Sequence, residues 1–162
     1  MTDVLRPMAP ADEAAVLALN AAAIEQTGPM DAALFQRLLE IGGESVVVER
    51  DGRLAGCLIV LADTAPHDGE NFRWFAERVR SFLYVDRIVV AERERGRQLG
   101  RLLYEHAAQR AADLGLRWIA AEVNAEPPNT TSLAFHARHG FVEIATRVLS
   151  EEKVVSYQLR AL

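Results

Sequence analysis

The sequence predicts an α/β (α+β) fold with a mixed, mostly antiparallel sheet of about seven strands, flanked by about four helices. Three observations predict it. Runs rich in β-branched residues alternate with segments whose apolar residues recur every three or four positions. Asp51-Gly52 separates two of the β-rich runs, as in a tight antiparallel hairpin. A strand, a helix and a strand follow one another over residues 82–124, which implies one right-handed parallel crossover.

The first part of the chain contains two predicted helices and a hairpin. After a short strand at residues 4–6, the segment PADEAAVLALNAAAIEQ (10–26) has helical apolar spacing, and Gly28-Pro29 ends it. The segment DAALFQRLLEIGG (31–43) begins a second helix with Asp31 as N-cap and stops it at Gly42. The run SVVVERDGRLAGCLIVLA (45–62) supplies the two strands of the hairpin.

The segment of residues 63–81 is irregular at first and then aromatic. It is too long for a simple hairpin loop, and its Phe72, Trp74 and Phe75 either line a binding site or pack into the core. The elements expected after it are a strand (82–90), a glycine-containing turn, a helix (98–114), a strand (117–124), a short helix (130–139) and two strands (141–150 and 153–161).

Length and composition indicate one domain spanning residues 1–162, because 50% of the residues are hydrophobic and no linker-like segment divides them. The net charge of -5 argues against a nucleic-acid binder. No basic, apolar leader and no membrane-length apolar run is present in the sequence, so we expect a cytoplasmic protein without a membrane partner. The lone Cys57 excludes an internal disulfide and reads as a buried hydrophobe. Self-association is open, and a homodimer is possible because closed symmetric dimers are common among soluble proteins.

The run RGRQLGRLL (95–103) joins a strand to a helix and has the character of an anion-binding turn. The first N–H groups of a helix lack carbonyl partners, and glycines such as Gly96 and Gly100 let the backbone approach a ligand. Arginines at 95, 97 and 101 add positive charge. Neither the GxxxxGK phosphate loop nor the GxGxxG dinucleotide fingerprint is present.

This run resembles the coenzyme A pyrophosphate motif of the GNAT superfamily of acetyltransferases, (R/Q)xxGx(G/A), with Arg95 first, Gly100 last and Gln98 in place of the middle glycine. Downstream, NTTSLAFHARHGF is similar to the family's NxxAxxLYxKxGF, with matches at Asn129, Ser132, Phe135, Arg138, Gly140 and Phe141. Gln98 either adopts a helical φ and points outward, which we expect, or crowds the turn and weakens cofactor binding.

The resemblance implies a splayed central parallel strand pair with acetyl-coenzyme A between the two strands, and no metal. The cofactor-binding residues it implies are Ile88, Val89 and Val90 for the pantetheine arm, Arg95, Gly96, Arg97, Gln98, Leu99, Gly100 and Arg101 for the pyrophosphate, and Asn129, Ser132 and His136 near the thioester. The reaction implied is direct attack of a primary amine, from a small molecule or a peptide, on the thioester in a ternary complex.

His136 stands at the family's tyrosine position, so the resemblance implies that it is the general acid. An imidazole ionises near neutral pH, so its pKa range differs from that of the usual tyrosine. Alternatively, His136 only hydrogen-bonds the cofactor or solvent.

Two carboxylates are candidate bases. Strand alternation places Tyr84, Asp86, Ile88 and Val90 on one face of their strand, and Glu122 with Asn124 on one face of the next. Either carboxylate could take the proton directly or through water, with Asp86 preferred by resemblance and Tyr84 as a further polar candidate. Both could instead be structural, with Asp86 paired to an arginine such as Arg73, and Glu122 to Arg87 or Arg117.

Two other functions remain open at this point. A catalytically silent, acyl-coenzyme A-binding regulatory module would account for the departures at Gln98 and His136. A transferase of a longer acyl group would need room beside Val90. The residues do not identify the acceptor amine.

Overall fold

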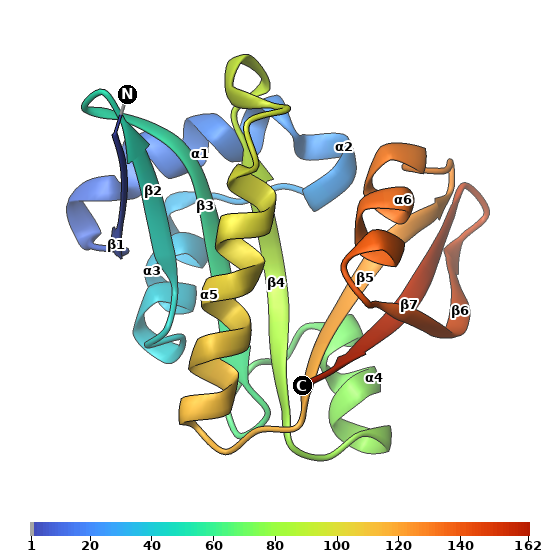
Figure 1. The fold of residues 1–162 in the computed structure, drawn as a ribbon. Coiled ribbons are helices and arrows are strands. Elements are labelled where there is room, and N and C mark those ends of the chain that lie inside the picture. Colours follow the sequence, from blue (N-terminus) through green and yellow to red (C-terminus); the bar gives the residue numbers. More distant parts are fainter. Residues whose placement is uncertain (1) are drawn as a thin grey trace.

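The computed structural model describes residues 2–162 and contains one mixed sheet of seven strands in the order β1-β2-β3-β4-β5-β7-β6 (Figure 1). The strands are β1 (Asp3–Pro7), β2 (Val46–Arg50), β3 (Arg53–Ala62), β4 (Phe82–Val90), β5 (Trp118–Glu126), β6 (Val142–Ser150) and β7 (Lys153–Ala161). Only the β4–β5 pair is parallel in this sheet. The predicted fold class is therefore confirmed.

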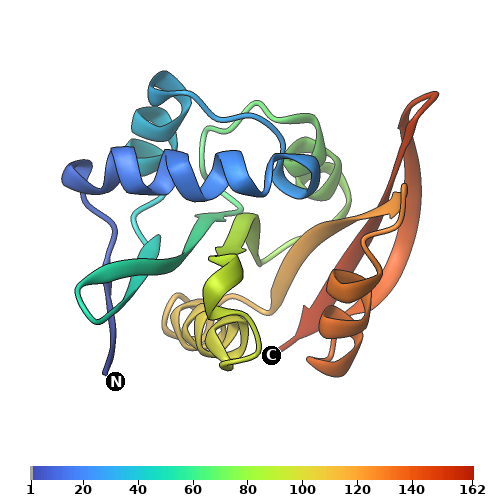
Figure 2. The same cartoon turned by 90° about the horizontal axis from the view of Figure 1, so that it is seen from above.

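Six α-helices lie within residues 2–162, two more than the four or so expected. They are α1 (Glu13–Ala22), α2 (Ile24–Thr27), α3 (Ala32–Ile41), α4 (Glu70–Arg78), α5 (Leu99–Asp113) and α6 (Thr130–Arg138). Figure 2 shows α1 to α4 on one side of the sheet and α5 and α6 on the other. The first predicted helix is divided into α1 and α2 because the backbone at Ala23 leaves the helical region, with φ -119° and ψ 23°.

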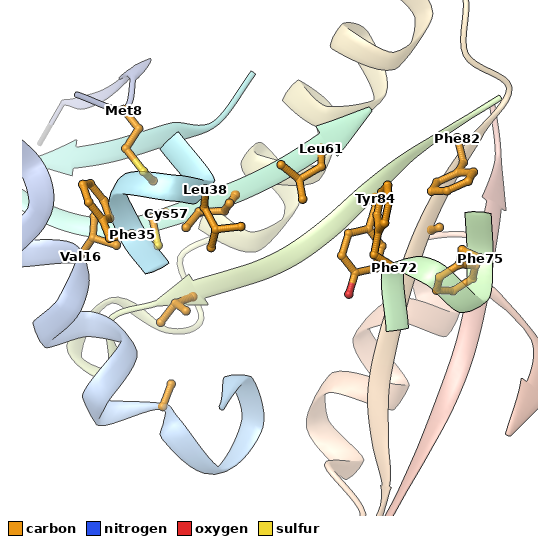
Figure 3. Close-up of a cluster of buried hydrophobic side chains, with 14 of the residues drawn as sticks. Met8, Val16, Phe35, Leu38, Cys57, Leu61, Phe72, Phe75, Phe82 and Tyr84 are labelled. Atoms are coloured by element: carbon orange, nitrogen blue, oxygen red, sulfur yellow. The ribbon is translucent and has the colours of Figure 1, made fainter. Parts of the chain in front are cut away.

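Helix α4 was missed by the sequence prediction because it is short, with nine residues, and four of these are charged. Its signals are Glu70 in the first turn, Arg78 in the last, and two aromatic residues three positions apart. These two, Phe72 and Phe75, are buried beside Phe82 and Tyr84 of β4 (Figure 3). The ring of Trp74 stacks on Tyr157 at 4.2 Å, so the aromatic residues of this segment serve the core.

A β-bulge in β4 changes which residues share a face. Arg87 pairs with Ile59 and Val85 with Val60, so Asp86 is an extra residue without a partner on β3. Tyr84 packs in the core on the α4 side, whereas Ile88 and Val90 pack in the core beneath α5. The prediction that Tyr84, Ile88 and Val90 share one face is therefore wrong, because regular alternation does not continue through a bulge.

The parallel strands stay together for only a short distance. Their register covers Phe82–Tyr84 against Trp118–Ala120, and beyond it β4 and β5 diverge towards the end of the sheet where α2 and α6 lie (Figure 1). From Val85 onward, the edge of β4 that faces β5 has no neighbouring strand. The splayed pair expected from the resemblance is thus present, and it opens the sheet at its centre.

No helix within residues 2–162 is long and apolar enough to cross a membrane.

Candidate active site

A pocket of 140 Å³ lies between the diverging strands and is lined by residues from both faces of the sheet. Glu122 and Asn124 alternate in step with Ala120 along β5, so their side chains lie on the α4 side of the sheet, where Ala120 packs. Tyr104 and His136 reach the pocket from α5 and α6, on the other side. The pocket therefore reaches through the sheet. We call its part on the side of α1, α2 and α4 the acceptor half, and its part beside α5 and α6 the cofactor half, after the two reactants that the resemblance implies for opposite sides of the site.

Glu122 lies in the acceptor half with two neutral hydrogen-bond donors. The hydroxyl of Tyr84 donates to the carboxylate, 2.9 Å from each oxygen, and the Asn71 amide nitrogen lies 3.2 Å from Oε1. Burial raises the pKa of Glu122 to about 7, helped by the nearby charge of Asp86 and opposed by the hydrogen bonds from Tyr84 and Asn71. Tyr84 does not line the pocket and stands behind the carboxylate, with its own pKa raised by burial and by Glu122.

Asp86 also lines the pocket, but it is held between cationic or proton-bearing partners. Arg87 Nε donates to Oδ2 at 2.8 Å, and His67 Nε2 lies 3.2 Å from Oδ1. Burial alone would raise the pKa of Asp86, yet the hydrogen bond from His67 and the charge of Arg87 outweigh it and hold this pKa below its usual value. The alternative in which Asp86 pairs with an arginine is thus correct, although the arginine is Arg87 and not Arg73.

The same arginine connects Asp86 to the first helices. Nη1 of Arg87 donates to Asn20 Oδ1 at 2.9 Å, and Thr27 Oγ1 donates to that oxygen at 2.9 Å. The Asn124 amide donates to the carbonyl of Glu25, which ties α2 to β5. These bonds fix α2 against the open end of the two strands, so it forms a wall of the acceptor half.

His136 is buried, and both of its ring nitrogens are engaged. Nδ1 lies 2.7 Å from the carbonyl oxygen of Ser132, which can only accept, so Nδ1 carries the proton. Nε2 then accepts from the hydroxyl of Tyr104 at 2.6 Å. Burial lowers the pKa of His136, with a further contribution from His139, and favours the neutral ring. With both ring nitrogens engaged, His136 fits the hydrogen-bonding alternative, and its role as a general acid stays a prediction.

The anion-binding turn differs from expectation at Gln98. This residue adopts φ 65° and ψ 15°, the left-handed region, immediately before α5 begins at Leu99. The expected helical φ is therefore wrong. The middle motif position requires positive φ, which glycine adopts freely and a side chain adopts at a cost of about 1–2 kcal/mol. The side chain of Gln98 is nevertheless exposed and does not crowd the turn.

The remaining residues of the turn suit a bound anion. The φ of Gly96 is +77°, and a Cβ on Gly100 would approach the ring of Phe135 to 3.0 Å, so Gly100 permits close packing of α5 on α6. Arg95, Arg97 and Arg101 are exposed, with Arg97 3.8 Å from Glu94 and Arg101 2.8 Å from Glu105. Free N–H groups at the start of α5 complete a cradle for phosphate groups.

The other predicted cofactor residues divide between the pocket and the core. Ile88, Ser132 and Asn129 line the pocket, and Asn129 also caps α6 by accepting from Ser132 N at 3.2 Å. Val89 is buried on the opposite face, and Val90 is partly buried under α5. The unpaired edge of β4, the start of α5 and the pocket together fit an elongated cofactor with a phosphate-bearing end.

Sequence reasoning missed Asn71, His67 and Tyr104. Asn71 and His67 come from the segment whose structure was ambiguous, and Tyr104 sits in the predicted helix at a spacing typical of core residues. The apolar spacing of this helix does not indicate that Tyr104 contacts His136, which lies thirty-two residues later in the sequence. Within residues 2–162, no group of three or more His, Cys, Asp or Glu side chains is arranged to hold a metal ion.

Comparisons with known proteins agree with this arrangement. The profile of the Acetyltransferase (GNAT) family matches residues 13–141. A search among curated proteins finds no match.

Solved structures share the fold at low sequence identity. Ard1 from Thermoplasma volcanium superposes with a TM-score of 0.82 and 17% identity over 100% of this chain and 99% of its own. The ribosomal-protein-S18-alanine N-acetyltransferase from Escherichia coli superposes with a TM-score of 0.74 and 16% identity, over 99% of this chain and 94% of its own. A chain of the NatC complex bound to Gag peptide and CoA superposes with a TM-score of 0.76 and 18% identity, over 100% of this chain and 99% of its own.

Proposed function

The chain belongs to the GNAT acetyltransferase family and is an acyltransferase, and from this premise we propose that it transfers the acetyl group of acetyl-coenzyme A directly to a primary amine in a ternary complex. The observation that carries the proposal is the pocket that reaches through the sheet, with a carboxylate of raised pKa in one half and a phenol–imidazole pair in the other. The two reactants enter from opposite faces and meet between β4 and β5.

The cofactor half and the anion-binding turn supply the binding groups. The backbone from Arg95 to Arg101 holds the pyrophosphate, the unpaired edge of β4 around Ile88 pairs with the pantetheine arm, and Asn129 and Ser132 lie beside its end. When bound, acetyl-coenzyme A supplies a thioester that an uncharged amine can attack and whose sulfur leaves as a thiolate.

Glu122 is the proposed general base. An amine bound in the acceptor half arrives mostly as an ammonium ion, and an acceptor with a pKa near 7 both takes and releases protons close to neutral pH. Tyr84 and Asn71 hold the carboxylate in place by donating to it. Asp86 supports the site differently, because its charge is committed to Arg87 and His67 and it fixes the arginine.

Tyr104 is the proposed donor to the leaving sulfur. Its hydroxyl lies in the cofactor half and is held by His136, whose ring is fixed in turn by Ser132. Burial raises the pKa of Tyr104, so the phenol stays protonated. Its single proton is donated to His136 in this structure, and in the proposed step it turns from His136 to the sulfur as negative charge develops there. His136 therefore acts through Tyr104 as a positioning residue.

The test is amine-dependent thiol release from acetyl-coenzyme A over a panel of primary amines, with Tyr104→Phe compared with the wild type. We expect turnover that falls about tenfold or more in the variant, with calorimetric affinity for acetyl-coenzyme A within a few-fold of the wild type, because one donor to developing charge is lost. Tight cofactor binding without turnover on any amine would favour a silent binding module. Faster turnover with a longer acyl-coenzyme A would favour the longer acyl group.

A further inference from the structure

The acceptor half of the pocket carries positive charge, although the protein as a whole has a net charge of -5. Four ionisable acidic or basic residues other than histidine line the whole pocket: Asp86, Arg87, Glu122 and Lys153. Asp86 is neutralised by its partners, and Glu122 with its raised pKa carries only part of a charge near pH 7. The charges of Asp86 and Arg87 offset each other, so Lys153 decides the sign of the field that a substrate meets.

Arg87 is a buried guanidinium with one donor group to spare. It is 9% exposed; Nε donates to Asp86 and Nη1 to Asn20, so the group is held rigidly. Nη2 makes no hydrogen bond within residues 2–162. Within residues 2–162, the one side-chain nitrogen or oxygen that is both solvent-inaccessible and without a hydrogen bond is Nδ1 of His67. Nη2 of Arg87 is therefore accessible to solvent. Because Arg87 also lines the pocket, its spare N–H groups are available to a ligand there.

Lys153 approaches the same half from the opposite wall. It begins β7, and its strand parity is that of Val155 and Tyr157, which pack on the α4 side of the sheet. It is half-buried at the pocket, and its side-chain ammonium forms no ion pair or hydrogen bond among residues 2–162. Figure 1 shows the turn between β6 and β7 at the end of the sheet where α2 and α6 also lie. Lys153 is the only lysine in the chain.

We propose that the acceptor is a primary amine that also carries a carboxylate, with the amine at Glu122 and the carboxylate between Arg87 Nη2 and Lys153. This inference rests on the proposed function and names the substrate class of the same site. A carboxylate would accept charge-assisted hydrogen bonds from the spare N–H groups of Arg87 and from the ammonium of Lys153, whereas a polyamine would place a second positive charge beside Lys153. Glu122 remains available to take the proton from the amine.

The test uses matched acceptors that differ only in the anion: glycine and glycinamide, β-alanine and β-alaninamide, and 4-aminobutanoate and its amide. Butane-1,4-diamine serves as the dicationic comparison. A peptide amide that begins with aspartate, paired with one that begins with asparagine, distinguishes an acidic peptide from a free amino acid. Thiol release gives kcat/KM for each acceptor. Reductive ¹³C-methylation of Lys153 gives an NMR reporter of carboxylate binding that needs no turnover and keeps the positive charge.

We expect the best acid to exceed its amide by about tenfold or more in kcat/KM, the loss expected when charged donors are left unpaired. Only the acid should shift the methyl signal of Lys153. Lys153→Met should remove most of the preference and Lys153→Glu should reverse it. Arg53→Met, which removes one exposed positive charge on β3, should leave it unchanged.

Equal kcat/KM for acids and amides, or an equal loss for both in Lys153→Met, would overturn the inference while leaving acetyl transfer intact. Absence of turnover with every acceptor would instead contradict the proposed function. In that case the Lys153 signal still decides the inference, since a shift with the acids alone supports it and no difference between acid and amide overturns it.

Discussion

Asp86 and Glu122 are two carboxylates that line one pocket from two neighbouring strands, yet their surroundings drive their pKa values apart. Asp86 is paired with the guanidinium of Arg87 and the ring of His67, which stabilise its ionised form. Glu122 is buried with neutral partners, and its pKa rises to about 7. Environment, and not residue type, therefore separates the pKa values of the two carboxylates, which supports Glu122 rather than Asp86 as the proposed base.

The largest expected effect comes from removing the proposed base. Glu122→Gln keeps the size and polarity of the side chain but cannot take a proton, so kcat should fall by roughly 10²–10⁴-fold. Calorimetric affinity for acetyl-coenzyme A should stay within a few-fold of the wild type. Stopped-flow thiol release measures the first quantity. A variant that keeps more than about a third of the wild-type kcat would break the comparison.

Asp86→Asn should damage stability more than chemistry. The substitution leaves the buried guanidinium of Arg87 without its counter-charge, which costs about 3 kcal/mol or more in the free energy of unfolding. Urea denaturation at pH 7 measures this loss. An unfolding midpoint equal to that of the wild type would mean that the ion pair does not hold this part of the site together.

The pH dependence of stability should separate the two carboxylates by sign. Because the folded pKa of Glu122 lies above its ordinary value of 4.5, at about 7, its contribution is fully present below pH 4.5 and is lost as pH rises through 7. As the pH rises from 5 to 8, the free energy of unfolding of Glu122→Gln should therefore increase relative to that of the wild type by up to about 3 kcal/mol. Asp86 has a lowered folded pKa, so its stabilisation is present above pH 3.8 and is lost as pH falls further.

Unfolding curves at several pH values test both signs. If the free energy of unfolding of Glu122→Gln and that of the wild type changed with pH in parallel across this range, the raised pKa of Glu122 would be ruled out.

The smallest effect is expected in the anion-binding turn, away from both carboxylates. Gln98→Gly removes the left-handed strain and should raise the free energy of unfolding by about 1 kcal/mol or less, because glycine also gains entropy in the unfolded chain. Acetyl-coenzyme A affinity should change by less than about tenfold. The pH profile of kcat/KM should not move. A shifted profile would mean that the turn and the carboxylate pair are coupled.

The fold and much of the site could be predicted from the sequence because their signals are local. The Asp51-Gly52 turn, with φ values of 52° and 76°, the N-cap Asn129 and the start of α5 lie where the residue types favour them. Glu122 was recognised as a candidate because strand order and parity place it at the opening between the strands.

What the sequence could not predict depends on long-range packing. The bulge at Asp86 leaves no local sign, yet it separates Tyr84 from Ile88 and places Arg87 beside Asn20. The pairing of Asp86 with His67, which argues against Asp86 as the base, could not be predicted for the same reason, since His67 comes from an irregular segment. The φ of Gln98 and the bond between Tyr104 and His136 are likewise set by tertiary structure.

The central claim is that Glu122, and not Asp86, titrates near neutral pH. Carboxyl ¹³C NMR of the protein labelled at glutamate and aspartate, titrated from pH 3 to 9 beside Glu122→Gln, measures this directly. We predict that the Glu122 signal has a midpoint near 7 and disappears in the variant, while Asp86 is ionised well below that pH. A Glu122 midpoint near 4.5, or an Asp86 signal titrating near 7, would contradict the account.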